Sequence, residues 1–155
     1  MQRNSSTIVN ILLAEDNPAD QELTRRVFED SKVANQLFVV SDGVEAMEFL
    51  HNIGKYSDSK QFSTPDVILL DINMPKKDGK EVLAEIKNDP KLASIPVIML
   101  TTSEHQKDIF ESYKLGVNAY IAKPVDIEEF MRVVSSLENF WLKTAELPGL
   151  IKRSA

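Results

Sequence analysis

The sequence predicts an α/β protein with a single five-stranded parallel sheet between helices, and three observations lead to this prediction. Short apolar runs alternate along the chain with segments of helical periodicity. The runs are apolar throughout, as is typical of strands that are buried on both faces. A helical segment follows each run, and such crossovers place successive strands parallel. A chain of 155 residues has room for about one such domain.

Five apolar runs mark the expected strands: residues 8–13, 37–40, 67–70, 97–100 and 118–122. Helices are expected after them: residues 17–30, 43–53, 80–88, 104–115 and 126–141. Asn17-Pro18 begins the first helix, because Asn caps free backbone N–H groups and Pro has none to satisfy. Asp89-Pro90 ends the third helix and Gly116 lies just past the fourth, while Asp126 with Glu129 resembles a capping box.

The expected helices are amphipathic, with apolar residues spaced so that they share one face. Leu23 and Val27 share a face of the first helix, and Val82 and Ile86 share a face of the third. The second helix follows a turn at Asp42-Gly43, and its apolar face is formed by Ala46, Phe49, Leu50 and Ile53. The apolar face of the last helix is formed by Ile127, Phe130, Met131, Val134, Leu137 and Trp141. These faces are expected to cover the two sides of the sheet.

Three segments interrupt or flank this pattern. Residues 51–64 are mostly polar and are predicted to form a long surface loop before the third strand. Residues 1–7 and 143–155 are predicted to be terminal tails. Residues 8–142 are expected to form the one domain of the chain, without internal repeats or low-complexity runs.

The composition argues against several classes of protein. The chain has no cysteine, which excludes a disulfide framework, thiolate metal ligands and a cysteine nucleophile. The 24 acidic residues outnumber the 18 Lys and Arg residues and give a net charge of −6, which argues against nucleic acid as a partner. No apolar stretch approaches the roughly 20 residues of a membrane span, and the first residues do not resemble a signal peptide. We therefore expect a soluble, cytoplasmic protein with no membrane partner.

Acidic and polar residues stand just after the expected strands. Glu15-Asp16 follow the first strand, Asp71 the third, Thr101 the fourth and Lys123 the fifth. In an open parallel sheet, ligands bind outside the carboxyl ends of the strands, where the strand order reverses. With the strand order 2-1-3-4-5 this point lies between strands one and three, so Glu15, Asp16 and Asp71 are expected to converge.

Three carboxylates in one small site repel one another unless cations neutralise them. A Mg²⁺ ion and Lys123 together would balance this charge, and Mg²⁺ prefers a few oxygen ligands and water. Asp71 is then a candidate nucleophile of the aspartyl-phosphate type. Lys123 can contact one phosphoryl oxygen as a point charge, and the Thr101 hydroxyl can donate a hydrogen bond to another.

Each of these residues has a plainer explanation when it is taken alone. An Asp after a strand is most often a helix cap or a turn residue, and a Lys before Pro is usually solvated. Glu15-Asp16 before Asn17-Pro18 could simply favour the positive end of a helix. The prediction of a phosphoacceptor site therefore depends on the combined occurrence of these residues after strands one, three, four and five.

With these motifs the sequence resembles the receiver domains of two-component response regulators. The resemblance runs from about Ile8 to Leu142. Four motifs carry it: Glu15-Asp16, residues 69–75 with Asp78-Gly79, Thr101-Thr102-Ser103, and Lys123-Pro124. It implies a flavodoxin-like (βα)5 receiver fold and a signalling protein that accepts a phosphoryl group from a partner histidine kinase. It does not imply an enzyme proper, because a receiver catalyses only its own phosphotransfer and dephosphorylation.

The resemblance also implies roles for individual residues, with Asp71 as the phosphoacceptor. The implied residues are Asp71, Lys123 and Thr101 for the phosphoryl group, Glu15, Asp16, Asp71 and the Asn73 main-chain carbonyl for Mg²⁺, Thr101 and Tyr120 for the switch, and Asn73 and Ser103 for the dephosphorylation rate. Many receivers have Asp-Asp where this chain has Glu15-Asp16. One of these two carboxylates is expected to act on the metal through water.

A narrower resemblance is to the single-domain receivers that pair with bacterial phytochrome-type histidine kinases, although the kinase could equally sense something other than light. It rests on the polar stretch before Pro65, on residues 75–79 and 100–103, and on Phe140-Trp141-Leu142. Phosphorylation is expected to change the face formed by helix four, strand five and helix five. With no output domain in this sequence, that face is expected to bind a partner or a second copy in a homodimer, and the protein could also act as a phosphate relay or sink. Phe140-Trp141-Leu142 either packs on the domain or contributes to the dimer.

Three alternatives have weaker support. A haloacid-dehalogenase-like phosphatase needs a lid domain and a second Asp two residues after Asp71, where this chain has Asn73. A flavin-binding domain needs small or hydroxyl residues after the first strand to bind phosphate, which residues 15–18 would repel. A receiver-shaped scaffold that is never phosphorylated would not need the intact set of site residues.

Overall fold

A computed structural model describes residues 8–32, 34–101 and 114–136 of the chain. Within these residues five parallel strands form one sheet in the order β2-β1-β3-β4-β5, which confirms the predicted strand order. The strands are β1 (Val9–Ala14), β2 (Asn35–Val40), β3 (Val67–Asp71), β4 (Val97–Thr101) and β5 (Ala119–Ala122). The helices are α1 (Pro18–Glu29), α2 (Gly43–Leu50), α3 (Gly79–Asn88) and α5 (Ile127–Ser136), with a 3₁₀ helix η1 (Gly54–Tyr56).

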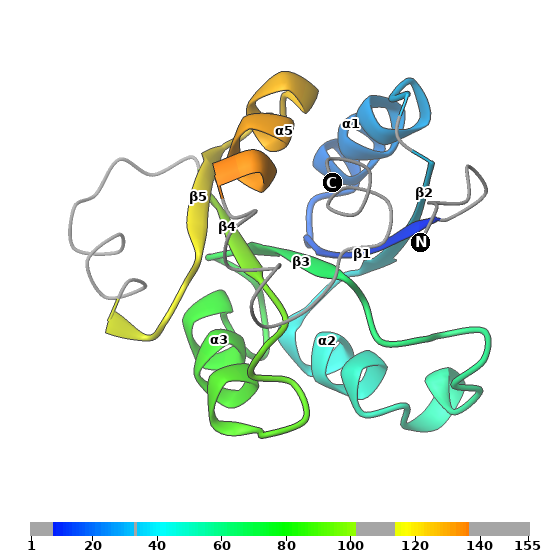
Figure 1. Cartoon of the computed structure of the whole chain (residues 1–155). Coiled ribbons are helices and arrows are strands. Elements are labelled where there is room, and N and C mark those ends of the chain that lie inside the picture. Colours follow the sequence, from blue (N-terminus) through cyan, green and yellow to red (C-terminus); the bar gives the residue numbers. More distant parts are fainter. Residues whose placement is uncertain (1–7, 33, 102–113, 137–155) are drawn as a thin grey trace, which may run out of the picture.

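The sheet separates two layers of helices, with α1 and α5 on one face and α2 and α3 on the other (Figure 1). Successive side chains of the central strands point to opposite layers. Ile68 and Leu70 of β3 belong to the core beneath α2 and α3, whereas Val67 and Leu69 belong to the core that contains Phe28 of α1. Because both faces are buried, the strand segments are apolar throughout, as predicted.

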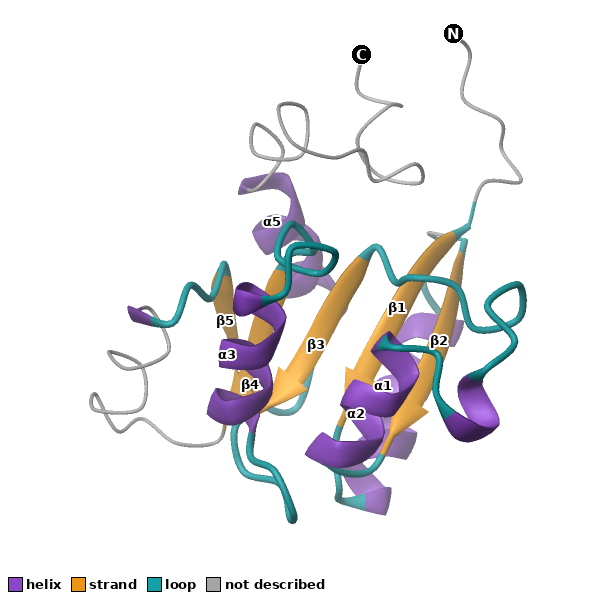
Figure 2. Ribbon diagram, turned by 90° about the horizontal axis from the view of Figure 1, so that it is seen from below, coloured by secondary structure: helices purple, strands orange, loops and turns teal. Residues whose placement is uncertain are grey.

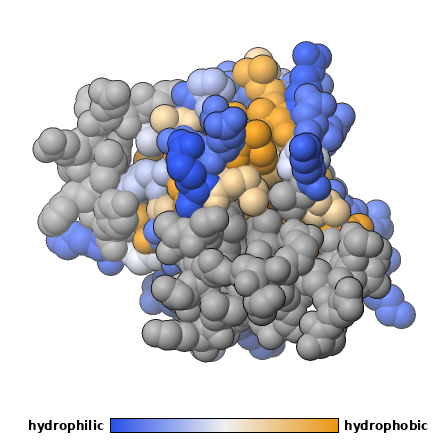
Figure 3. Space-filling view, turned by 45° about the horizontal axis from the view of Figure 1, so that its top comes forward, coloured by the Kyte–Doolittle hydropathy of each residue, from blue (hydrophilic) through white to orange (hydrophobic). Residues whose placement is uncertain are grey.

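An aromatic contact joins the two helices of the α1 and α5 layer. The rings of Phe28 and Phe130 pack edge to face with their centroids 5.0 Å apart. Ile127 and Met131 are partly buried against the same core, which confirms this part of the predicted α5 face. Figure 3 looks towards the α1 and α5 side, where an apolar area lies between hydrophilic side chains.

The helix starts are capped by side chains, as the sequence leads one to expect. The Asn17 side chain accepts hydrogen bonds from the backbone N–H groups of residues 19 and 20, and Asp126 accepts one from Glu129. Asp42, predicted only to turn the chain, caps α2. The complete capping box is at Asp78, whose carboxylate accepts from the Glu81 N–H while the Glu81 side chain accepts from the Asp78 N–H.

The predicted apolar faces of α1 and α2 are wrong at one residue each. Leu23 is 48% exposed, and α1 instead buries Thr24 and Phe28, one position further along the helix. Ile53 is 54% exposed because α2 ends at Leu50. Asn52 takes the left-handed backbone conformation, with a φ of 54°, which turns the chain out of the helix before Ile53.

The prediction of a simple surface loop at residues 51–64 is also wrong in part. The short helix η1 folds this segment back onto α2, and it buries Tyr56, which is 7% exposed. The Tyr56 ring lies 5.1 Å from the ring centroids of both Phe49 and Phe62, and Phe38 packs against the last two rings. The aromatic loop cluster, as we call Phe38, Phe49, Tyr56 and Phe62, thus anchors the polar segment to the domain.

Several sequence-based expectations fall outside the described residues. They concern the tails 1–7 and 143–155, Ser103, most of the fourth helix (104–113), and the end of the last helix with Phe140-Trp141-Leu142. Gly116, expected just past the fourth helix, has a φ of 98°, the left-handed conformation typical of that position. Among the helices of the described ranges, none has both the length and the apolar character to cross a membrane.

The Tyr56 hydroxyl donates a hydrogen bond to the Glu45 carboxylate. Because of this contact, the free energy of unfolding should decline as the pH becomes alkaline. Burial and Glu45 raise the pKa of Tyr56 to about 12 from an ordinary value of 10.0. Because the unfolded chain loses this proton first, the stabilisation is complete below about pH 10 and declines between pH 10 and 12. Tyr56→Phe should lower the free energy of unfolding by about 1–2 kcal/mol at neutral pH and remove this part of the alkaline decline.

Urea denaturation at a series of pH values would measure both effects. The matched control is a double-mutant cycle with Glu45→Gln, in which Tyr56→Phe should cost clearly less because its partner is no longer charged. Parallel stability curves for the wild type and Tyr56→Phe between pH 9 and 12 would contradict this account.

Candidate functional site

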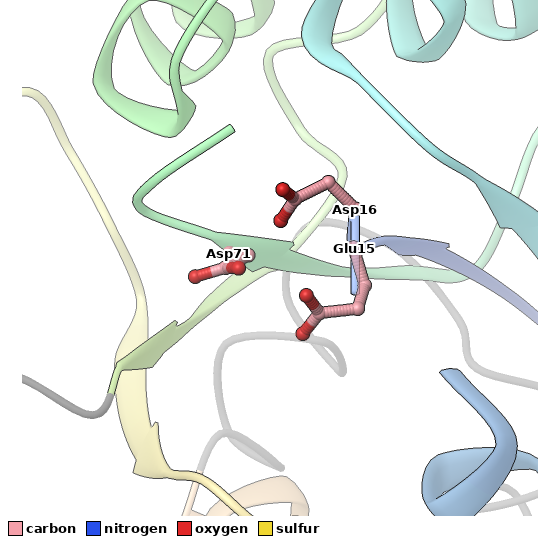
Figure 4. Close-up of side chains that lie close together, drawn as sticks. All are labelled: Glu15, Asp16 and Asp71. Carbon is pink, nitrogen blue, oxygen red and sulfur yellow. The ribbon is translucent and has the colours of Figure 1, made fainter. Parts of the chain in front are cut away.

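The carboxyl ends of the strands meet at one edge of the sheet, as the parallel arrows in Figure 2 show. Glu15 and Asp16 follow β1, and Asp71 is the last residue of the neighbouring strand β3. Their carboxylates point toward one another (Figure 4), and one oxygen of each lies within 4.8 Å of the others. The predicted convergence of these three residues at the reversal of strand order is therefore observed.

The ammonium group of Lys123 lies among three carboxylates. Its Nζ atom is 2.7 Å from Glu15 Oε1, 3.2 Å from Asp71 Oδ2 and 3.0 Å from Asp20 Oδ2. The side chains of Glu15, Asp71 and Lys123 are only 1%, 7% and 11% exposed, so water screens these charges poorly. Lys123 from the loop after β5 therefore links the ends of β1 and β3 to the first turn of α1.

Asp20 does not directly follow a strand and was not predicted as a site residue. It is the third residue of α1, and Asn17 and Pro18 set where that helix begins. The signal that could have pointed to it is its place in the first turn of the helix that begins directly after Glu15-Asp16. The same turn supports the site through Gln21, whose side-chain amide donates to the backbone carbonyl of Glu15 at 2.5 Å.

Burial and mutual charge shift the pKa values in this pocket. Burial works against the charged form of Lys123, but its hydrogen bonds with Glu15 and Asp20 and the charge of Asp71 raise its pKa above the ordinary value. Burial raises the pKa of Glu15, and the charge of Asp71 adds to this, while Lys123 and the Asn17 N–H partly offset it. The pocket thus holds more negative charge than one lysine can neutralise.

The donor set suits a small divalent cation. Mg²⁺ takes oxygen ligands at about 2.0–2.1 Å and usually retains several waters. Three carboxylate oxygens within 4.8 Å of one another can approach one such ion, and Asp16 is exposed, which leaves room for water. Glu15 differs from Asp16, because both of its oxygens already accept hydrogen bonds, from Lys123 and from the Asn17 N–H.

The remaining predicted residues are buried to different degrees. Thr101, the last residue of β4, is buried and follows Leu100, which pairs with Asp71. Tyr120 of β5 is partly buried against the core beneath α2 and α3. Asn73 is exposed, and its backbone N–H lies 3.4 Å from Asp71 Oδ1. The roles predicted for these three residues stay predictions, and Ser103 lies outside the described part of the chain.

A close backbone approach explains why Gly79 follows Asp78 in this site. The Gly79 N–H donates to the carbonyl of Ile72, and a Cβ atom at Gly79 would lie 2.2 Å from the carbonyl oxygen of Asp71. Any larger residue would therefore push the start of α3 away from the end of β3. Because Gly79 has no side chain, the start of α3 can pack directly against the end of β3 behind Asp71.

Lys123 is expected to stabilise the metal-free fold, because without it Glu15 would remain buried next to Asp71 with no cation. Lys123→Met keeps most of the apolar stem and should lower the free energy of unfolding by about 3 kcal/mol in a chelating buffer. Added Mg²⁺ should reduce this loss, since a divalent cation also neutralises the carboxylates. Chemical denaturation with and without Mg²⁺ measures both quantities.

The control is Lys77→Met, which removes a lysine paired with the more exposed Glu85. Such a surface pair contributes about 1 kcal/mol or less, and its loss should not depend on Mg²⁺. Equal losses in the two variants would show that Lys123 has no special role in balancing the buried carboxylates.

Comparisons with known proteins agree with this geometry. A family model described as the response regulator receiver domain matches residues 11–135. The response regulator Rcp1 of Synechocystis is 46% identical over 139 residues, which cover 90% of this chain and 92% of that protein. The crystal structure of its Mn²⁺-bound form superposes with a TM-score of 0.71, at 45% identity, and covers 90% of this chain and 99% of that one.

Two further solved structures are similar. One is the phosphorylated cyanobacterial phytochrome response regulator RcpA, with 48% identity, a TM-score of 0.73 and coverage of 92% of this chain and 99% of that one. The other is the receiver domain of the sensor histidine kinase PA1611 from Pseudomonas aeruginosa with a magnesium ion in its active-site cleft. It has 28% identity and a TM-score of 0.67, and the match covers 84% of this chain and 97% of that one.

These similarities bear on two of the three alternatives raised by the sequence. They argue against a haloacid-dehalogenase-like phosphatase and a flavin-binding domain, and they confirm the predicted flavodoxin-like receiver fold. Receiver domains bind Mg²⁺ at an acidic pocket, and the acidic cluster of such a pocket is present here, which confirms the predicted cofactor. The chain belongs to the response regulator receiver domain family.

Proposed function

We propose that this protein is a response regulator that accepts a phosphoryl group on Asp71 from a partner histidine kinase, in a reaction that requires Mg²⁺. One observation carries this proposal: Asp71 is buried at the reversal of strand order, within 3.2 Å of the Lys123 ammonium and close to Glu15 and Asp16. A carboxylate in this position has both a nucleophilic oxygen and positive charge beside it. The similarity to a phosphorylated phytochrome response regulator supports the same chemistry.

In the proposed reaction an Asp71 carboxylate oxygen attacks the phosphorus of a phosphohistidine. The new O–P bond forms as the P–N bond breaks, and the imidazole leaves with the electron pair of that bond. Such transfers depend mainly on positioning and on stabilising the charge of the phosphoryl oxygens. Lys123 would stabilise one of these oxygens, and the Thr101 hydroxyl would donate a hydrogen bond to another.

Asp16, Asp71 and the main-chain carbonyl of Asn73 are the proposed ligands of Mg²⁺, with Glu15 acting through water. The hydrogen bonds already made by both Glu15 oxygens support this division between the two acidic residues. The bound cation would supply charge neutralisation for the carboxylates and the incoming phosphoryl group. The protein would act as a signalling phosphoacceptor whose turnover is limited to its own dephosphorylation, with Asn73 and Ser103 setting that rate.

We propose that phosphorylation is read out on the face that contains β5 and α5, together with residues 104–115. A phosphoryl group on Asp71 would attract the Thr101 hydroxyl, and Tyr120 would move inward, as a population shift between two arrangements. Tyr120 is partly buried and pairs in register with Met99, two residues before Thr101, so the two switch residues lie close along the sheet. The changed face would bind a partner protein or a second copy of the chain.

The proposed phosphoryl donor is a phytochrome-type histidine kinase in the cytoplasm. The support for this donor is the similarity to RcpA, a phytochrome response regulator, over 92% of the chain. The test compares the rates at which autophosphorylated kinases with and without a phytochrome sensor transfer labelled phosphate to this protein. Phytochrome-type kinases should transfer it at least about tenfold faster, which corresponds to about 1.4 kcal/mol in the barrier. Equal rates would remove the support for a light-sensing partner.

Incubation with Mg²⁺ and acetyl phosphate tests the phosphoacceptor directly. Intact mass spectrometry should detect a phosphoryl adduct on the wild type, none on Asp71→Asn, and none on the wild type after chelation of the metal. The matched control is Asp66→Asn. Asp66 lies just before the start of β3, at the far end of that strand from Asp71, and accepts a hydrogen bond from the Asn10 N–H. This variant should form the phosphoryl adduct as the wild type does. An unmodified wild type would favour a scaffold that is never phosphorylated.

A further inference from the structure

Asp20 competes for the lysine that the phosphoryl group needs. An ammonium group has three N–H donors, and Lys123 has three carboxylate partners in the structure: Glu15, Asp20 and Asp71. A phosphoryl oxygen must then compete with these three carboxylates for the ammonium group. One of these contacts must break or be shared when Asp71 is phosphorylated.

The Asp20 contact is the one that can be lost at the smallest cost. The Asp20 side chain is 32% exposed, whereas those of Glu15 and Asp71 are 1% and 7% exposed. Water can solvate an exposed carboxylate that loses its partner, but a buried one would remain unpaired. Asp20 also lies in the first turn of α1, where the helix dipole stabilises its charge without Lys123.

We propose that Asp20 is a positioning residue that holds Lys123 in the unphosphorylated state and releases it to the phosphoryl group. This inference rests on the proposed function of Asp71. While Asp20 is paired with Lys123, it draws positive charge away from Asp71, so a cation can approach the acidic cluster more easily. The same pairing opposes the phosphorylated state, because the phosphoryl oxygens must compete with a carboxylate for one ammonium group.

The proposal predicts opposite changes in two affinities when Asp20 loses its charge. In Asp20→Asn, Lys123 should stay closer to Asp71 and Glu15, so Mg²⁺ should bind about threefold to fivefold more weakly. At saturating Mg²⁺ the phosphoryl analogue beryllofluoride should bind about threefold to fivefold more tightly, because Lys123 is released without competition. Damage to the fold of the pocket would instead weaken both.

Calorimetric titration of Mg²⁺ and ¹⁹F NMR titration of beryllofluoride would measure these affinities. Glu22→Gln is the matched control, since it removes one negative charge from the same helix at a residue paired with Arg26 and exposed to solvent. Asp20→Glu keeps the charge and should keep both affinities closer to the wild type than Asp20→Asn does. Denaturation of each variant measures its effect on the stability of the fold separately.

The outcomes separate this inference from the proposed function. Opposite shifts in Asp20→Asn, absent from Glu22→Gln, support the inference. Shifts in the same direction, or shifts no larger than those of Glu22→Gln, overturn it even if the wild type is phosphorylated. A wild type that binds neither Mg²⁺ nor beryllofluoride contradicts the phosphoacceptor function itself.

Discussion

The electrostatic balance at the ends of β1 and β3 is the constraint on which the rest of this structure depends. The carboxylates of Glu15, Asp16 and Asp71 lie close together, although their charges repel. The fold permits this because Lys123 reaches three carboxylates from the loop after β5. Two of them, Glu15 and Asp71, are buried, so the attraction to Lys123 is weakened little by solvent.

Backbone geometry behind the site is as specific as the charges within it. Gly79 allows α3 to begin against the carbonyl of Asp71, and the Asp78–Glu81 capping box determines where that helix starts. The end of β3 is therefore fixed from behind, and Asp71 has little freedom to move away from its neighbours. A carboxylate held rigidly beside an ammonium group would suit the proposed phosphoryl transfer, which depends on positioning.

The strand order and the convergence of Glu15, Asp16, Asp71 and Lys123 could be predicted from sequence, because buried parallel strands are apolar throughout and functional residues follow their carboxyl ends. Asp20 does not follow a strand, and its contact with Lys123 depends on how α1 is oriented against the loop after β5. The burial of Tyr56 was missed for a similar reason. A polar segment gives no local sign that a short 3₁₀ helix will return one ring to the core.

The burial of Glu15 at 1% exposure also has a consequence for protein engineering. Proteins often store unfavourable interactions at the sites where they work, and stability is lower as a result. In this domain the stored energy is the repulsion between carboxylates held together for a cation. Selection for heat resistance alone would therefore be expected to favour neutral residues at these positions, and the resulting proteins would be more stable but would lack the proposed phosphoacceptor site.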